Sequence, residues 1–574
     1  VIDFMLSNTW NSSQYLAQTN PNIQFVYNAT FNEDGQNSTD TQPTIVSINV
    51  KERRQYQKMV GLGAGVTDAT AIILQALKAN RPDAYEEILN LCFNESPEWI
   101  AKGGAGMNMI RLPIGASDFG FTEYTYDDTV DGTPDPTLSN FDINKSPKRW
   151  QTVQDILKIN PGLIVMASPW SPPAWTKGNT RGSLQGGSIL QQYEGAFGDY
   201  LVKFVKTLKE SKGITVKVLS LQNEPLYDGA KYPCSKMLPD QQARIGALTR
   251  QKLDAAGFNS VKILAYDHNW DNTEYPIDVF DDAAEDFAGV AWHCYGGDPS
   301  GQEPFNEAYP DRWVWFTECT RITQYYEEPW ENIKKQFSQI IKGSISYNSQ
   351  AVILWNLALQ IDKEGFTVPS LPQTCRNCLA PIVVYDNSTG PELEGMNRAA
   401  IDSQKNRRSL TGPTLNNDND LFQMFSKRDD AKNLGVLMNA ASLSDASAMN
   451  QGADNEGSVI PPTRDTNYRT SDYVTLAHLG VAIRPQKDGE RWAQRVGVVT
   501  SEDDHSGPVV KAQLFRNSLG NGSSRWSVII LQQYDHYGYD RAKAEDITFQ
   551  LKFRNYVATF VLPPGAFTLQ WTAE

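Results

Sequence analysis

Short apolar runs alternate with longer amphipathic stretches over residues 57–359. This rhythm is typical of repeated βα units around a parallel sheet. Eight runs favour a closed (β/α)8 TIM barrel, although alternation alone is also compatible with an open doubly wound sheet. The first strand is expected near Lys58, and the others at 107–113, 163–169, 217–222, 262–265, 289–293, 313–317 and 351–357.

The segments between these runs have helical periodicity. In residues 193–208 the apolar side chains recur at three- and four-residue spacing, as on a helix with one buried face. Pro239 and Asp240 predict the start of the next helix, with Asp240 as its capping side chain, and Gly257 predicts its end near Ala256. These features indicate structure and imply no chemistry.

Both ends of the chain have strand-like alternation. Residues 473–574 contain segments such as 526–532, 547–553 and 558–562, separated by Gly, Asn and Pro turns. Residues 1–56 have the same character, notably at 23–27 and 44–50. The predicted fold is therefore an α/β protein with a catalytic barrel over 57–386 and an accessory all-β sandwich formed from both chain ends.

Residues 387–472 are rich in Asn, Asp, Ser and Arg and contain few apolar side chains. Such a composition cannot bury enough apolar surface to form a core, and it predicts an inserted polar loop or a partly disordered segment. Residues 434–438 are the one stretch inside it that resembles a strand.

Composition narrows the functional classes. The chain has 574 residues, of which 40% are hydrophobic and 21% charged, as in globular proteins with a large core. Apolar runs such as 163–167 are far shorter than the roughly 18–20 residues of a membrane span, so no span is expected. The net charge of −15 argues against nucleic acid, because phosphate binding requires a basic surface.

The sequence also suggests secretion. The chain begins at Val1 without a charged and apolar leader, as a mature secreted protein would, although a recombinant fragment would begin in the same way. Seven N-x-S/T sequons are compatible with an extracellular glycoprotein, and we expect a monomer. The sequons begin at Asn11, Asn28, Asn37, Asn94, Asn144, Asn387 and Asn521.

Six cysteines are too few to form a disulfide scaffold for a chain of this length. Cys375 and Cys378 form a C-x-x-C motif in a loop, and the absence of a second pair favours a local disulfide over a zinc or redox site. The other four are compatible with either thiols or bridges, and their pairing stays open: Cys92, Cys234, Cys294 and Cys319.

Two glutamates lie at predicted strand ends. The strand over 217–222 is followed by Asn223-Glu224-Pro225, and the strand over 313–317 by Glu318. Retaining glycoside hydrolysis requires two carboxyl groups facing one sugar, and a barrel presents its active site at the C-terminal strand ends. A single strand-end glutamate is usually an ordinary carboxylate. Asn223, which offers a donor and an acceptor to a sugar hydroxyl, and the aromatic residues near Glu318 favour catalysis.

These two motifs resemble glycoside hydrolase family 30. Further segments are similar to the family in the same order, and the resemblance covers roughly 60–359 and continues weakly over 473–485. A Gly-x-Gly at 61–63 is also found in nucleotide loops, but the third glycine and the downstream acidic residue of that pattern are missing. The similar segments are GLGAGVTDA (61–69), RLPIGASDF (111–119), YTYDD (124–128), SPWSPPAW (168–175), HCY (293–295) and WNLAL (355–359).

The resemblance implies a retaining β-glycosidase with Glu224 as general acid/base and Glu318 as nucleophile. It also implies that Arg111 orients the nucleophile and that Asn223 hydrogen-bonds the 2-hydroxyl of the sugar. Each further candidate has a structural alternative, as a core tryptophan, a satisfied barrel histidine or a turn-forming aspartate. Those that would shape the −1 sugar pocket are Asp118, Trp170, His293, Tyr295 and Trp355.

The family acts on β-1,6-glucans, glucosylceramides, xylans, galactans and fucosides. The segments 111–113 and 124–128 resemble those of the β-glucan and glucosylceramide branches more than those of the xylanases. We therefore expect an endo-β-1,6-glucanase, with a glucosylceramidase or a β-xylosidase or xylanase as alternatives. A carbohydrate-binding protein without catalysis is the alternative of another class, and the presence of both glutamates argues against it. No metal or cofactor is expected, since the five histidines are scattered, and no G-x-S-x-G motif supports a serine hydrolase.

Overall fold

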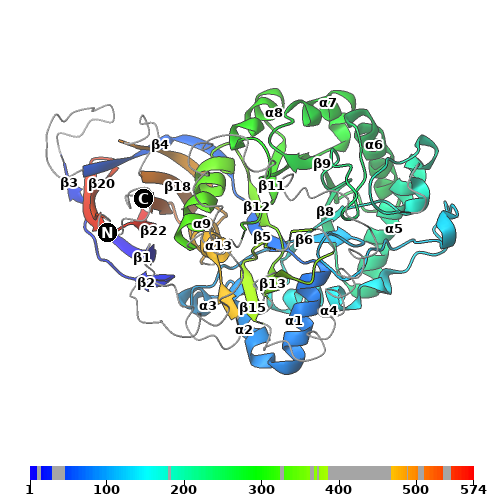
Figure 1. The fold of residues 1–574 in the computed structure, drawn as a ribbon. Coiled ribbons are helices and arrows are strands. Elements are labelled where there is room, and N and C mark those ends of the chain that lie inside the picture. The colour runs from blue at the N-terminus through cyan, green and yellow to red at the C-terminus, as the bar shows by residue number, and fades with distance from the viewer. Residues whose placement is uncertain are drawn as a thin grey trace, which may run out of the picture.

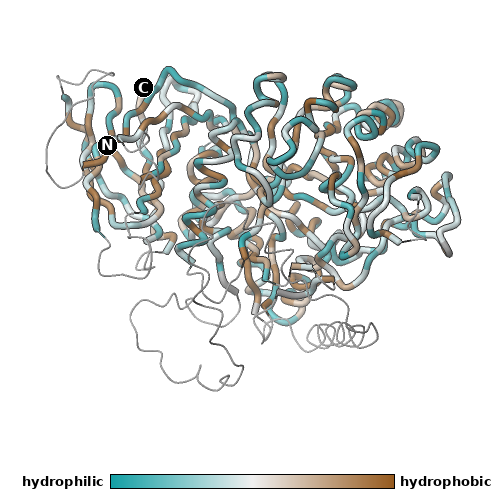
Figure 2. The backbone as a smooth tube through the Cα atoms, turned by 45° about the horizontal axis from the view of Figure 1, so that its top comes forward, coloured by the Kyte–Doolittle hydropathy of each residue, from teal (hydrophilic) through white to brown (hydrophobic). Residues whose placement is uncertain are grey.

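The computed structural model describes residues 1–9, 15–28, 45–178, 183–322, 329–361, 367–371, 374–375, 377–385, 467–487, 489–501, 510–533 and 545–574. Within them, a barrel and an accessory sheet lie side by side, and both chain ends lie in the accessory sheet (Figure 1). Figure 2 shows hydrophobic and hydrophilic residues interleaved along both parts, as expected when each element buries one face.

Eight parallel strands close the barrel, which confirms the closed alternative over an open sheet. Almost every barrel residue is buried, because the helices cover the outer face and side chains fill the interior. The strands are β5 (Gly61–Gly65), β6 (Met109–Ile114), β7 (Ile164–Pro169), β8 (Val216–Ser220), β9 (Lys262–Asn269), β10 (Gly289–His293), β11 (Trp313–Glu318) and β12 (Ala351–Leu354).

Helices surround these strands. The predicted helix over 193–208 is α5 (Glu194–Lys212). The predicted cap of α6 (Pro239–Ala255) is wrong: Leu238 holds the cap position without a side-chain hydrogen bond, and Asp240 instead pairs with Arg244 one turn later. The others are α1 (Asp68–Asn80), α2 (Pro82–Phe93), α3 (Pro97–Ala101), α4 (Pro147–Ile159), α7 (Glu274–Ala283), α8 (Glu303–Ala308), α9 (Pro329–Gln336) and the π-helix η7 (Phe337–Ser344).

The first barrel strand begins later than the sequence suggested. Lys58 is the last residue of β4 (Ile45–Lys58), which pairs with Gln494 in the accessory sheet. The barrel strand β5 starts three residues further on, at Gly61. An apolar run does not reveal which of two sheets it joins, so the sequence does not show that the strand at 44–50 continues to Lys58 in the accessory sheet.

The accessory sheet has ten strands drawn from both chain ends. Trp526 on β19 lies 5.0 Å from Phe553 on β20, and Phe553 lies 5.5 Å from Trp571 on β22, measured between ring centroids. These strands are distant in the sheet order, so the sheet folds over itself around one apolar core. The order is β2 (Ala17–Thr19), β1 (Ile2–Thr9), β22 (Gly565–Ala573), β19 (Ser524–Gln532), β18 (Val510–Ser518), β17 (Gln494–Thr500), β4, β20 (Ile547–Phe553), β21 (Tyr556–Leu562) and β3 (Val26–Tyr27).

The expectation of strands from Tyr473 onward is wrong at its start. Residues Ser471–Ile483 form the helix α13, and all thirteen of its side chains are buried. The helix packs against α9 and β5 on the barrel side and against β19 and β22 on the accessory side. Because it is enclosed all round, α13 has no polar face, and its sequence lacks the period that identifies an amphipathic helix.

A small sheet follows the barrel. The predicted strand over 351–357 ends early, at Leu354, as β12 of the barrel. The next strand, β13 (Ala358–Ile361), forms this sheet with β14 (Thr367–Val368), β15 (Ile382–Tyr385) and β16 (Asn467–Arg469). The rest of the predicted insertion, including 434–438, lies outside the described residues. No helix among the described residues has the length and apolar character needed to cross a membrane.

Two disulfides are present among the described residues. Cys375 and Cys378 are bonded, which confirms the local bridge. Cys294 and Cys319 form a second disulfide across 25 residues, and the buried Cys92 and Cys234 are free thiols.

Candidate active site

The structure brings all nine candidate residues to the C-terminal ends of the barrel strands. This position follows from the fold, because parallel strands of one barrel all end on the same face. The residues are Arg111 on β6, Asp118 in the loop after it, Trp170 directly after β7, Asn223 and Glu224 after β8, His293 at the end of β10, Tyr295 just beyond it, Glu318 at the end of β11 and Trp355 directly after β12.

Glu318 is held by two donors. Arg111 Nη1 donates to Oε2 of Glu318 at 2.5 Å, and the Tyr295 hydroxyl donates to Oε1 at 3.0 Å. The second guanidinium nitrogen of Arg111 donates to Oδ1 of Asn223 at 2.7 Å. Both carboxylate oxygens of Glu318 are therefore fixed in place, and the side chain is only 6% exposed.

Asp267, at the end of β9, is the centre of the polar network. Its Oδ2 accepts hydrogen bonds from Arg111 Nη2 and from the Ser168 hydroxyl, both at 2.8 Å. Its Oδ1 accepts from the Thr317 hydroxyl at 2.7 Å and lies 3.0 Å from His293 Nε2. Burial opposes ionisation, but the positive charges of Arg111 and His293 hold the pKa of Asp267 well below its usual range. Asp267 is thus a fully buried carboxylate with compensated charge.

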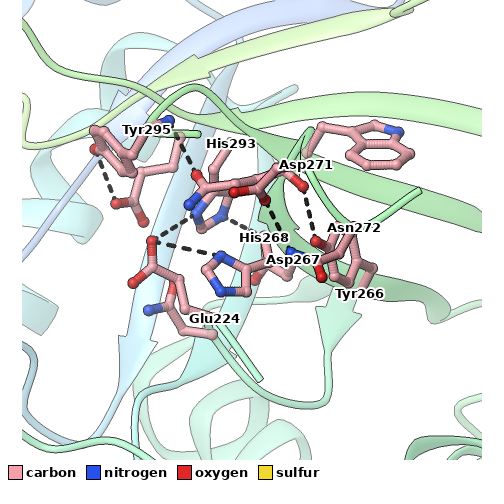
Figure 3. A network of polar contacts seen from close by, with 12 residues as sticks. Glu224, Tyr266, Asp267, His268, Asp271, Asn272, His293 and Tyr295 are labelled. Carbon is pink, nitrogen blue, oxygen red and sulfur yellow. Dashed lines mark hydrogen bonds and ion pairs between the residues drawn. The ribbon is translucent and has the colours of Figure 1, made fainter. Parts of the chain in front are cut away.

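Glu224 lies on the other side of His293. His293 Nδ1 is 3.2 Å from Oε1 of Glu224, and Figure 3 shows His293 between the carboxyl groups of Glu224 and Asp267. The Glu224 backbone has a φ of 47°, and Tyr266 and Asp267 also have positive φ. Such conformations cost on the order of 1–3 kcal/mol each and persist where the surrounding structure enforces them. The strand ends therefore force Glu224 into its position.

The two glutamates are coupled electrostatically. Burial raises the pKa of Glu318, and the negative charge of Glu224 adds to this effect against the opposing charges of His293 and Arg111. Burial also opposes ionisation of Glu224, but the hydrogen bond and the charges of the histidines outweigh it and lower its pKa. Despite its own burial, His293 has a pKa raised to about 9 by the surrounding carboxylates. His293 therefore carries a proton at neutral pH and shares it with Glu224.

The two tryptophans form a buried layer beneath Arg111. Trp170 and Trp355 are each 2% exposed and stack on one another with ring centroids 4.9 Å apart. The Arg111 guanidinium lies 4.8 Å from the ring centroid of Trp170, within range of a cation–π interaction. Beside them, burial and the charge of Glu318 raise the pKa of Asp118 well above its usual range. In this structure the tryptophans support Arg111 and present little open surface for a sugar ring.

Sequence reasoning missed Asp267 and His268. Both lie on β9, which extends four residues beyond the predicted end at 265. His268 Nδ1 is 4.0 Å from Oε1 of Glu224. The signal available was the polar Asp-His-Asn run that begins two residues beyond the predicted end of this barrel strand, at the level where the other strand ends carry candidate residues.

A covalent link supports two of these strand ends. Cys294 follows His293 directly, and Cys319 follows Glu318 directly, so the disulfide joins the residues that come after β10 and β11. The bridge restricts how far these two strand ends can separate.

Solved structures show the same fold. The chain aligns over 99% of both chains with the endo-β-1,6-glucanase BT3312, with a TM-score of 0.67 and 20% identity. It also aligns over 100% of this chain and 99% of the other with SrfJ from Salmonella typhimurium, with a TM-score of 0.70 and 17% identity. At these identities the comparison establishes the architecture of barrel and accessory sheet.

Sequence comparison identifies relatives. The chain is 36% identical over 289 residues to endo-1,6-β-D-glucanase BGN16.3 of Trichoderma harzianum, which covers 48% of this chain and 56% of that protein. It is 30% identical to an endo-1,6-β-D-glucanase of Neurospora crassa, over 59% of this chain and 63% of that protein. The mouse lysosomal acid glucosylceramidase is 27% identical over 59% of this chain and 65% of its own length. The chain thus spans between half and two thirds of the length of these relatives.

The family model completes the comparison. Residues 59–373, more than half of the chain, match the glycosyl hydrolase family 30 TIM-barrel domain. This match includes both strand-end glutamates and the whole barrel, and it confirms the resemblance found in the motifs. The chain belongs to glycosyl hydrolase family 30.

Proposed function

We propose that the protein is a secreted, retaining β-glycosidase that cleaves β-1,6-glucan at internal linkages, with Glu224 as general acid/base and Glu318 as nucleophile. The observation that carries the proposal is the network between the two glutamates: Glu318 is fixed by Arg111 and Tyr295, and Glu224 is connected to the same network through His293. One carboxylate is thereby oriented for attack, and the other lies beside a proton.

In the first step, Glu318 attacks the anomeric carbon while Glu224 protonates the leaving oxygen. Arg111 and Tyr295 donate to separate oxygens of Glu318, so they fix the direction of attack and lower the entropic part of the barrier. The proton that Glu224 needs is available at 3.2 Å on His293 Nδ1. The products of this step are a glycosyl ester on Glu318 and a free leaving group.

In the second step, Glu224 removes a proton from water, which attacks the same carbon and releases the sugar from Glu318. Direct attack by a carboxylate requires the two carboxyl groups to be about 5–5.5 Å apart, whereas inversion requires about 6.5–9.5 Å. Two successive inversions retain the configuration of the substrate.

The remaining candidates contribute binding. Oδ1 of Asn223 accepts from Arg111, so its amide nitrogen remains as the donor to a sugar 2-hydroxyl. Asp118 forms a hydrogen bond with another hydroxyl of the −1 sugar. Because the pKa of its buried carboxyl is raised, Asp118 can donate this bond when it is protonated and accept it when it is ionised. Tyr295 and His293 complete the −1 pocket next to the catalytic carboxyls.

The substrate proposal is supported by the two fungal endo-1,6-β-D-glucanases, which are more similar to this chain than the mouse glucosylceramidase is. For secretion, the supporting feature is the exposure of sequons such as Asn144 and Asn521 on the surface.

Hydrolysis of a substrate panel tests the proposal. We expect activity on β-1,6-glucan that releases a ladder of oligosaccharides, and rates at least tenfold lower on xylan and glucosylceramide. Glu318→Gln serves as the matched inactive control, because it keeps the size of the side chain and removes its charge. Release of monosaccharide alone would contradict the endo mode, and a preference for glucosylceramide or xylan would replace the proposed substrate by one of the alternatives.

A further inference from the structure

Three metal-binding groups converge beside the catalytic network. Glu224, His268 and His293 each offer one ligand atom, and these three atoms lie within 4.8 Å of one another. They come from the adjacent strand ends of β8, β9 and β10, and Figure 3 shows both imidazole rings pointing toward the Glu224 carboxylate. Two imidazole nitrogens and one carboxylate oxygen are a ligand set that zinc accepts in proteins.

The distances are close to those of a metal site. Ligand atoms around a tetrahedral zinc ion lie about 3.3 Å apart, as follows from metal–ligand bonds of about 2.0–2.1 Å. His293 Nδ1 and His268 Nδ1 are 3.2 Å and 4.0 Å, respectively, from Glu224 Oε1. The His293–Glu224 spacing is already that of two ligands on one ion, and a shift of the His268 ring by less than an ångström toward Glu224 gives the second pair the same spacing.

His293 has the second partner that zinc-binding histidines usually have. Its Nε2 lies 3.0 Å from Oδ1 of Asp267, whose charge is balanced by Arg111. A carboxylate at one ring nitrogen orients the imidazole and raises the basicity of the other nitrogen toward a metal ion. The nitrogen left for the metal is Nδ1, the one that faces Glu224.

The unpaired ring nitrogen of His268 supports the metal site independently of these distances. The residue is 8% exposed, and its Nδ1 has no hydrogen-bond partner although the atom is buried. An unpaired buried polar atom costs about 1–3 kcal/mol. A ligand that accepts the lone pair of Nδ1 recovers this cost, and that atom faces the Glu224 carboxylate.

We propose that Glu224, His268 and His293 form an inhibitory binding site for one Zn²⁺ ion. The ion takes one lone pair from each of the three groups, and the proton shared by His293 and Glu224 is released to solvent. It is not a cofactor of the reaction: with its oxygen bound to zinc, Glu224 can no longer protonate a leaving group. The inhibitory effect rests on the proposed role of Glu224, whereas metal binding does not.

Binding is tested by titrating Zn²⁺ alone into the metal-free protein in a calorimeter. We expect one ion per chain, and an affinity at least tenfold lower in His268→Ala. His505→Ala, whose histidine lies outside the described residues, is the matched control and should bind as the wild type does. Equal affinity of His268→Ala and the wild type would overturn the site.

A second measurement does not depend on a variant that folds. Co²⁺ added to the wild-type protein should give the intense visible absorption of a four- or five-coordinate ion, and addition of Zn²⁺ should remove it. The weak spectrum of hydrated Co²⁺ would contradict the site.

Inhibition is measured separately, with β-1,6-glucan as substrate, because its sugar leaving group needs the proton that Glu224 supplies. Zn²⁺ should inhibit the wild type and the His505→Ala control, and at least tenfold more Zn²⁺ should be needed for the same fractional inhibition of His268→Ala. Zinc that binds through His268 without slowing turnover would leave the metal site standing, would overturn its inhibitory role and would contradict Glu224 as the acid.

Discussion

Nη2 of Arg111 lies 2.8 Å from Oδ2 of Asp267, and neither side chain is accessible to solvent. The same guanidinium also contacts Glu318 and Asn223, so one buried ion pair determines the position of the proposed nucleophile and of a proposed sugar ligand. Asp267 touches neither proposed reacting carboxyl directly. We therefore regard it as a positioning residue that acts through Arg111 and His293.

Asp267→Asn should reduce both stability and turnover. The substitution keeps the shape of the side chain but removes one of the two buried carboxylates that pair with Arg111, and Glu318 remains as the other. Removing one partner of a buried ion pair costs up to about 3–5 kcal/mol of unfolding free energy. The loss of activity should appear mainly in kcat, because the orientation of Glu318 changes more than the binding of remote sugars. Chemical denaturation and steady-state kinetics measure the two effects. Asp199→Asn, which removes the partner of Lys252 in an ion pair whose carboxylate is 50% exposed, is the control and should cost less than about 1 kcal/mol.

Glu224→Ala should affect substrates according to their leaving groups. An alkoxide or sugar leaving group needs a proton in the first step, whereas an activated aryl group does not. We expect kcat/KM for the glucan to fall by at least a hundredfold more than kcat/KM for a dinitrophenyl glucoside. Equal losses on both substrates, measured under the same conditions, would argue against the acid/base role.

The Cys294–Cys319 disulfide should contribute substantially to stability. Its sequence separation of 25 residues corresponds to about 3.5 kcal/mol in the chain-entropy model. The variant with both cysteines replaced by serine should lose about this unfolding free energy and part of its activity, because the bridge adjoins His293 and Glu318. Replacing Cys375 and Cys378, whose separation is only 3 residues, should cost less. Equal losses in the two double variants would contradict this explanation.

Asp472 should make the stability depend on pH. Burial raises the pKa of this carboxyl to about 6, although a hydrogen bond from Gln336 opposes the shift. Folding thus favours the protonated form of Asp472. Its contribution to the free energy of unfolding, about 3 kcal/mol, is fully present below about pH 4 and is lost as the pH rises through 6. Asp472→Asn, neutral at every pH, should flatten the stability profile over pH 4–7 when unfolding is followed by denaturant. Asp199→Asn, at an exposed ion pair, should leave the profile unchanged.

The barrel could be predicted because each of its strands is a short, almost continuous apolar run buried on both faces. The helix α13 could not, since residues enclosed on every side have no polar face and therefore no helical period. The boundary at Lys58 was misplaced for a related reason: β4 and β5 follow one another directly, and only the three-dimensional pairing separates the two sheets.

In the site, Glu224 and Glu318 could be predicted because retaining glycoside hydrolysis requires two carboxyl groups, and a barrel presents its active site at the C-terminal strand ends. Asp267 and His268 are harder to recognise, since a polar run after an apolar strand also resembles the start of a loop. Their burial depends on partners distant in sequence, such as Arg111 for Asp267, which is 156 residues away. The disulfide between Cys294 and Cys319 likewise depends on two strand ends that only the closed barrel brings together.

The stereochemistry of hydrolysis tests the central claim most directly. If Glu318 forms a glycosyl ester and Glu224 then activates water, two inversions restore the starting configuration. Proton NMR of the anomeric region, recorded during rapid hydrolysis of a β-glucoside before mutarotation, should show the β-anomer of the product first. Initial release of the α-anomer would contradict the double displacement and the roles assigned to both glutamates.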